Sequence, residues 1–394
     1  RGKASAEDLQ NPAAFGTLAG VCRKGRSHQS FPREIRTVTS NLKGARVAAE
    51  RGARLTREDA LLLYKDNDLL ALAAWARAAK ERASGRNVYY TVNRHINLTN
   101  ICSANCPLCA FQVEQGDARG YIMETDDVAR VLETAQKTPR LTEIHIVSAL
   151  HPDRPFSYYE GVVRQVRAAL PDADIKAFTP VEIVNFAKTE GMSVRSILSA
   201  LQEAGLSSLP GGGAEILSDR VRRLIAPKKI MTEDWLRVMR TAHKIGMAST
   251  ATMVIGFGET MAERVTHMEH IRRLQEETGG FRAFITWTFQ PGNTALGGEK
   301  TSSWDYMRTL AVTRLYMDNV PHIQGSWVTQ GERIGQLTLG FGADDLGSIM
   351  LEENVVRAAG TRYNMSIKKM IELIRGAGRE PAQRDTQYRV IRRF

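Results

Sequence analysis

The alternation of strand-like and helical runs is the feature that most limits what this 394-residue chain can fold into. Short β-branched or apolar runs recur along most of it, and helical runs separate them. Repeated β–α units build a parallel sheet with helices on its outside. Eight stretches begin as strands, some quoted with the loop that follows: residues 88–97, 143–150, 174–179, 206–217, 248–260, 282–289, 322–328 and 336–343. The pattern therefore predicts an α/β fold, a (β/α)8 TIM-type barrel.

The chain divides into three predicted segments. Residues 1–45 lack periodicity and are rich in Arg, Ser and small residues, so we expect a poorly ordered or targeting-like tail. Residues 46–86 form a predicted N-terminal helical extension, in which Thr56 and Asp59 have the spacing of a helix start. Residues 87–394 hold the barrel and a C-terminal helical segment. Cys22 falls in the tail and is expected to be an unligated thiol.

Composition disfavours two classes of partner. The net charge is +11, but residues 1–50 alone carry nine Lys and Arg against four Asp and Glu. Elsewhere basic and acidic residues are interspersed, with no basic run interleaved with aromatic residues, so we expect no nucleic-acid partner. No apolar run approaches the ~20 residues of a membrane span, and no hydrophobic signal core is present. We expect a cytoplasmic protein without a membrane partner.

Three of the four cysteines lie together, as Cys102, Cys106 and Cys109 in a C-x3-C-x2-C spacing. Clustered thiolates favour zinc or an iron–sulfur cluster. A structural zinc site takes four protein ligands, so the fourth would have to be a distant side chain such as His95. Three cysteines would instead leave one iron of a cubane open to a small chelating molecule. The spacing therefore favours a [4Fe-4S] cluster with one open iron over zinc.

This spacing, in the loop after the first strand of a βα barrel, resembles the radical S-adenosylmethionine enzymes. The resemblance implies a [4Fe-4S] cluster on the three cysteines, with S-adenosylmethionine chelating the open iron through its amino and carboxylate groups. Reduction of the cluster by a donor such as flavodoxin or ferredoxin would generate a 5′-deoxyadenosyl radical. The family's Gly-Gly-Glu after the second strand is replaced by "VSAL" (147–150). Ser148 is therefore the expected cofactor contact there.

Further stretches resemble the radical enzymes of the futalosine route to menaquinone. "NRHIN", "HIVSALHPD" and "IKAFTPVEI" are similar to the enzymes that add the adenosyl radical to 3-[(1-carboxyvinyl)oxy]benzoate. "IAPKK", "FQPGNT", "GSWVTQG" and "GSIMLEENVV" are similar to the cyclases that abstract ribose H4′ of dehypoxanthine futalosine. The later stretches are the more distinctive, so we expect the cyclase activity on a small-molecule substrate. The adduct-forming activity is the alternative, and a non-catalytic metal- or nucleic-acid-binding protein is the hypothesis from another class.

Two glycine-rich turns carry candidate cofactor contacts. "PGGGAEIL" lacks the Lys and Ser/Thr of a phosphate-binding loop, and it reads either as a tight βα turn or as a loop that aims Glu215 at cofactor or substrate. "GFGET" resembles the adenosine-binding turn of the family. There Gly256 and Gly258 would allow close backbone approach, and Glu259 would accept a hydrogen bond from a ribose hydroxyl.

Candidate catalytic residues lie in loops after predicted strands. His151 could act as an acid or base, or cap a helix. The cyclase needs an acceptor for the ring proton, and Glu353 is a candidate in a late loop; a surface role is the alternative. The predicted catalytic residues are therefore His151, Glu215 and Glu353.

Overall fold

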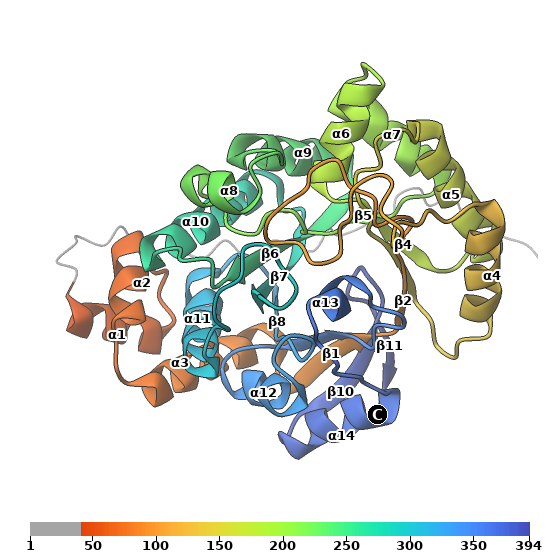
Figure 1. Ribbon diagram of the computed structural model, residues 1–394. Coiled ribbons are helices and arrows are strands. Elements are labelled where there is room, and N and C mark those ends of the chain that lie inside the picture. Colours follow the sequence, from red (N-terminus) through yellow and green to blue (C-terminus); the bar gives the residue numbers. More distant parts are fainter. Residues whose placement is uncertain (1–40) are drawn as a thin grey trace, which may run out of the picture. The chain divides into compact units, whose positions relative to one another are not determined.

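The computed structural model describes residues 41–394, in which parallel strands curl into a ring with helices outside it (Figure 1). Neighbouring strands pair in parallel in chain order from β2 to β9. The strands are β1 (Asn87–Thr91), β2 (Asn93–Ile96), β3 (Glu143–Ile146), β4 (Asp174–Ala177), β5 (Ser208–Leu209), β6 (Ala248–Ile255), β7 (Phe281–Thr288), β8 (His322–Gln324) and β9 (Asp345–Ser348).

The segment 87–96 closes the ring. Its two halves, β1 and β2, are separated only by Val92, so they act as one barrel strand. β2 pairs with β3, while β1 pairs with β9 on the other side. Beyond β9, the His95 amide donates to the Leu351 carbonyl (3.0 Å), and the Leu351 amide donates to the Asn93 carbonyl (3.1 Å). The first and last strands are therefore joined, and the predicted (β/α)8 TIM-type fold is confirmed.

The helices between strands bury apolar faces against the outside of the ring. In α9, for example, the buried residues are Trp235, Leu236, Val238, Met239 and Ala242. The spacing of these residues is that of one helical face. These helices are α4 (Thr125–Gln136), α5 (Phe156–Ala169), α6 (Pro180–Thr189), α7 (Val194–Ala204), α8 (Asp219–Ile225), α9 (Thr232–Lys244), α10 (Met261–Thr278), α11 (Ser303–Tyr316) and α12 (Glu332–Leu337).

The helical extension comprises α1 (Leu42–Arg51), α2 (Arg57–Tyr64) and α3 (Leu69–Ser84). The predicted helix start is confirmed, because Thr56 and Asp59 form a capping box. Arg57 pairs with Glu269 of α10 at 3.1 Å, so the extension lies against the outer helices. Helix α1 begins just before the predicted boundary at residue 45, and the rest of the predicted tail, Cys22 included, lies outside the described residues. No helix in the described range is long and apolar enough to cross a membrane.

The last predicted strand, residues 336–343, is wrong. These residues complete α12 and form a 3-10 turn (Thr338–Gly340), and the eighth barrel strand is β9. The run "ADDLG" reads as a solvated loop, but both its acids are buried. Asp344 accepts from Arg314 (2.7 Å) and Asp345 from Arg384 (2.7 Å). Arginines distant in the sequence thus neutralise the two acids, so the composition of the segment alone does not indicate a buried strand.

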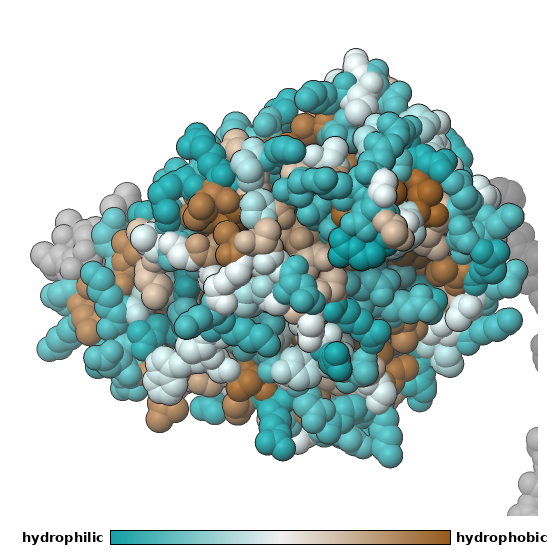
Figure 2. Space-filling view, in the orientation of Figure 1, coloured by the Kyte–Doolittle hydropathy of each residue, from teal (hydrophilic) through white to brown (hydrophobic). Residues whose placement is uncertain are grey.

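The C-terminal segment contains two helices and an unpredicted hairpin. The elements are α13 (Val355–Ala358), α14 (Ile367–Gly376), β10 (Glu380–Arg384) and β11 (Val390–Arg393). β10 pairs in parallel with the first half of the 87–96 segment, and β11 pairs antiparallel with β10. Figure 2 shows a mostly hydrophilic face with apolar residues in small patches, as expected when the apolar faces point to the core.

Candidate active site

One cavity of about 380 Å³ lies inside the ring, and the three clustered cysteines line it. The loop that carries them follows β2, so it stands at the carboxyl end of a barrel strand, where TIM-type enzymes place their chemistry. From there the cavity extends to Thr91 of β1 and to Arg384, which pairs with Asp345 at the amino end of β9. The space is therefore deep, and it connects the thiols with the interior of the barrel.

Backbone hydrogen bonds hold the cysteine loop in shape. The Cys102 amide donates to the Val113 carbonyl (3.0 Å), the Val113 amide to the Asn100 carbonyl (2.9 Å), and the Cys109 amide to the Cys106 carbonyl (3.0 Å). None of the three thiols forms a disulfide. The loop therefore presents three free thiols to one cavity.

The three thiols suit a cluster. Within residues 41–394 no three His, Cys, Asp or Glu side chains are placed to hold one metal ion. A cubane makes a different demand, because each thiolate binds its own iron. Three thiols on one loop, beside a cavity with room for a further ligand, meet that demand.

Glu215 lies in the same cavity, beside the cysteines. Its Oε1 accepts from Lys229 Nζ at 3.0 Å, and Arg222 lies 3.6 Å from Oε2. Burial alone would raise the pKa of Glu215, but Lys229 and Arg222 lower it, so the side chain is ionised. Oε2 has no hydrogen-bond partner in the described structure. One carboxylate oxygen is thus left for a ligand.

The glycine loop before Glu215 is shaped by close packing. A Cβ on Gly211 would lie 2.6 Å from the Ala251 backbone of β6, so only glycine fits there. The buried Arg222 guanidinium donates to the carbonyls of Gly213 (3.0 Å) and Ala214. These contacts fix the loop and aim Glu215 into the cavity.

Ser148, just after β3, and Glu182, in the first turn of α6, also line the cavity. The Ser148 amide donates to Glu182 Oε1 (2.9 Å), and the Thr179 amide donates to Oε2 (2.7 Å). Burial raises the pKa of Glu182 to about 7 despite these donors. The Ser148 hydroxyl is buried without a partner in the described range. Glu182 was not predicted from the sequence, where "TPVE" reads only as a capped helix start.

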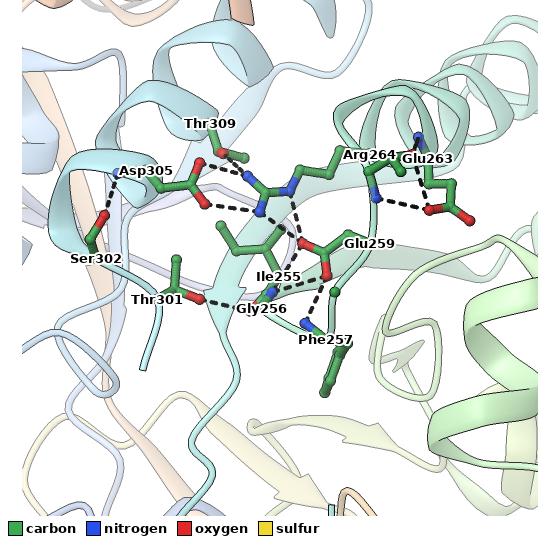
Figure 3. Close-up of polar contacts among 12 residues, drawn as sticks. Ile255, Gly256, Phe257, Glu259, Glu263, Arg264, Thr301, Ser302, Asp305 and Thr309 are labelled. Atoms are coloured by element: carbon green, nitrogen blue, oxygen red, sulfur yellow. Dashed lines mark hydrogen bonds and ion pairs between the residues drawn. The ribbon is translucent and has the colours of Figure 1, made fainter. Parts of the chain in front are cut away.

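The "GFGET" turn has a different environment (Figure 3). Gly256, Gly258 and Glu259 are not among the residues that line the cavity. Both Glu259 oxygens accept from backbone amides: Oε1 from Gly256 (3.0 Å) and Oε2 from Phe257 (2.7 Å). Arg264 Nε also donates to Oε1 at 2.8 Å. The carboxylate is therefore engaged inside the protein.

The remaining predicted catalytic residues lie apart from one another. His151 is not among the cavity-lining residues, and its Nδ1 accepts from the Asp153 amide (3.1 Å), as in a turn. Glu353 does line the cavity, but its oxygens accept from the amides of Val356 (2.9 Å) and Arg357 (3.2 Å). Burial raises the pKa of Glu353. The structure brings together Ser148, Glu215 and Glu353 with the cysteines.

The inward face of the first barrel strand is polar. Thr91, Asn93, His95 and Asn97 all line the cavity, alternating with Val92, Arg94 and Ile96. Strand alternation in "TVNRHIN" carries this signal, because a packed barrel would place apolar residues at every second position. Arg94 faces the other way and pairs with Glu352 at 2.7 Å.

Comparison with known proteins identifies the class. Residues 96–271 match the model of the radical SAM superfamily, and residues 278–393 match the CofH/MqnC C-terminal region. Over the described fold, the hydrogenase maturase HydG from Carboxydothermus hydrogenoformans superposes with a TM-score of 0.70 at 16% identity, covering 88% of this chain and 80% of that one. The barrel and the cysteine loop are thus those of a radical SAM enzyme.

Two relatives give the narrower family. The aminodeoxyfutalosine synthase of Thermus thermophilus is 43% identical, covering 86% of this chain and 93% of that protein. The cyclic dehypoxanthine futalosine synthase of Halalkalibacterium halodurans is 41% identical, covering 88% of this chain and 94% of that protein. This chain belongs to the radical SAM family that these enzymes represent.

Proposed function

We propose that this protein cyclises dehypoxanthine futalosine by abstraction of the ribose H4′, in the futalosine route to menaquinone. The observation that carries the proposal is the lining of the cavity on its β7–β9 side. Trp287, Gln324, Ser348 and Met350 come from the region that matches the CofH/MqnC model and contains three of the four cyclase-like stretches. They face the same space as the cysteines.

Cys102, Cys106 and Cys109 would hold a [4Fe-4S] cluster, and Ser148 and Glu215 would contact S-adenosylmethionine. When bound and reduced by a donor such as flavodoxin or ferredoxin, the two groups supply a carbon-centred radical. Lys229 keeps Glu215 ionised, and its positive charge lies near the thiols of Cys106 and Cys109. The Gly256–Glu259 turn would support the adenosine, with Glu259 fixing the turn rather than binding ribose.

The chain's own contribution to the reaction is orientation, exclusion of water and proton transfer. Leu108, Phe111, Val355 and Val356 line the cavity and would keep solvent from the reacting carbon atoms. Restoring the aromatic ring takes the loss of one ring proton and one electron. The electron would return to the oxidised cluster, and Glu353 is the proposed proton acceptor because it lines the cavity and burial raises its pKa. His151 lies outside the lining, which favours a role in its turn.

Anaerobic turnover tests the proposal. The reconstituted, reduced protein would be given S-adenosylmethionine with dehypoxanthine futalosine, and the products would be identified by mass spectrometry. We expect free 5′-deoxyadenosine and a product lighter than the substrate by two hydrogens. An intact cluster with no such product would refute the cyclase assignment.

Formation of aminodeoxyfutalosine is the second candidate. It is favoured by the β2–β4 side of the cavity, which "NRHIN", "HIVSALHPD" and "IKAFTPVEI" supply, and by the Thermus thermophilus relative. The same assay with 3-[(1-carboxyvinyl)oxy]benzoate would then give an adenosyl adduct with loss of carbon dioxide. The two products differ in mass, so one experiment separates the candidates.

A further inference from the structure

Two histidines form an unusual pair in the cavity wall. His95 of β2 and His145 of β3 are register partners on adjacent parallel strands, and their ring centroids are 4.7 Å apart. Both line the cavity. The Nε2 atom of each ring is buried and lacks a hydrogen-bond partner within the described residues. Buried polar atoms are normally satisfied, so the two rings call for an explanation.

The next strand adds a cation to the same row. Lys176 of β4 is the register partner of His145 and also lines the cavity. Its Nζ contacts both oxygens of Glu143, at 2.8 and 2.9 Å. An ammonium group has three hydrogens, so one remains for a ligand. His95, His145 and Lys176, which we call the polar row, therefore line one wall of the cavity.

The charged acceptors near the polar row are already in use. Glu143 also accepts from Asn93 (2.9 Å) and Thr386 (2.7 Å). Asp345, deeper in the barrel, accepts from Arg384 Nε (2.7 Å) and from the Gly347 amide. The wall therefore has spare donors but no spare carboxylate, which suits an anionic group.

The protonation of the two rings agrees with this role. The pKa of His95 is lowered to about 4 by burial, which Glu143 opposes and Lys176 reinforces. The pKa of His145 is lowered well below its usual value by burial, Lys176 and His95. Both imidazoles are neutral at pH 7, and each then offers one N–H donor.

We propose that the polar row binds the carboxylate of an aryl carboxylate substrate, with its ring directed towards the cysteine loop. The inference rests on the proposed function for the substrate class, but both candidate substrates carry a meta-substituted benzoate. It therefore holds whichever of the two reactions the enzyme performs. His95 and His145 are positioning residues in this scheme.

Binding measurements test the polar row without turnover. The probes are 3-methoxybenzoate and 3-methoxybenzamide, titrated calorimetrically and anaerobically into cluster-loaded protein with S-adenosylmethionine. The acid and the amide have similar shapes but differ in charge. We expect the wild type to prefer the acid by about 10-fold or more, the size of a charge-assisted hydrogen bond.

The variants are His95→Phe and His145→Phe, which keep an aromatic ring and remove the donors. Each should weaken the acid about 10-fold and leave the amide nearly unchanged, so the preference collapses. His270→Phe, on the outer helix α10, is the matched control and should keep the preference. Cluster absorbance and S-adenosylmethionine binding report folding. Where a Phe variant does not load the cluster, the Gln variant at the same position replaces it, with a smaller loss expected.

Three results would overturn the proposal: no acid preference in the wild type, a preference unchanged in both Phe variants, or equal weakening of acid and amide. The last result would assign the rings to an uncharged polar group. Failure here is distinct from failure of the proposed function. An acid preference without either turnover product would refute only the proposed reaction. Turnover without an acid preference would refute only carboxylate binding by the polar row.

Discussion

Two glycine-rich turns look alike in the sequence, yet the structure gives their glutamates different surroundings. Glu215 follows "PGGGA" and Glu259 follows "GFG", each after a barrel strand. Glu215 keeps one oxygen without a hydrogen bond and faces the cavity. Glu259 accepts from backbone amides at both oxygens and from Arg264 at Oε1. The spare oxygen of Glu215 is suited to a ligand, whereas the amide and guanidinium donors around Glu259 suit it to holding its turn.

The largest effect is expected at the cysteine loop, beside which Glu215 lies. Cys106→Ser should abolish turnover and lower the iron content from roughly four per chain, because a cubane needs its thiolates. Iron analysis and the absorbance near 400 nm measure this. Cys22→Ser, outside the cluster motif, is the control and should retain full iron content. An equal loss of iron in both variants would contradict the assignment of the three clustered cysteines.

Glu259→Gln should act on stability. Its side chain is 1% exposed and that of Arg264 is 6% exposed, and Arg264 also binds Asp305 at 2.7 Å (Figure 3). Breaking a buried ion pair on one side costs about 3 to 5 kcal/mol. Denaturant unfolding measures this loss. The specific activity of the folded fraction should change far less, and a loss of activity without a loss of stability would give this turn a direct role in the reaction.

Glu215→Gln should lower the activity of the folded fraction as well as stability. The amide oxygen can still accept from Lys229, but the buried Arg222 and Lys229 lose the charge that neutralises them, so the unfolding free energy should also fall. The charge facing the cofactor is lost, and we expect turnover to fall about 100-fold, the scale of one lost electrostatic contact in an enclosed site. Steady-state kinetics with varied S-adenosylmethionine measure the effect. If stability falls and specific activity does not, the distinction between the two turns fails.

A third buried carboxylate extends the comparison to pH. The folded-state pKa of Glu182 is raised to about 7 by burial, above the unfolded value of about 4.5. The folded state therefore favours the protonated acid, and ionisation costs stability as pH rises from about 5 to 8. Relative to Glu182→Gln, which does not titrate, the wild type should lose about 1 to 3 kcal/mol across that range. A pH-independent difference between the two proteins would contradict the raised pKa.

Much of the fold was predictable because periodicity reports local structure. The Thr56–Asp59 helix start, seven of the eight strand positions and the cysteine loop follow from local patterns. Residues 336–343 did not, because the acids of β9 are neutralised by Arg314 and Arg384, which are distant in sequence. The C-terminal hairpin was missed for a related reason: β10 is a strand because it pairs with β1, some 290 residues earlier in the chain.

The sequence by itself determined the barrel, the family resemblance and the three cysteines, since each depends on spacing along the chain. Tertiary structure alone decided which side chains share the cavity. It brought Glu182 and Lys229 to the cysteines, enclosed Glu259 in an ion-pair network, and placed His95 beside His145. The physical reason is that the hydrogen-bond donors and acceptors around a side chain decide which of its own polar atoms stay unpaired. Those neighbours come from segments far apart in the chain.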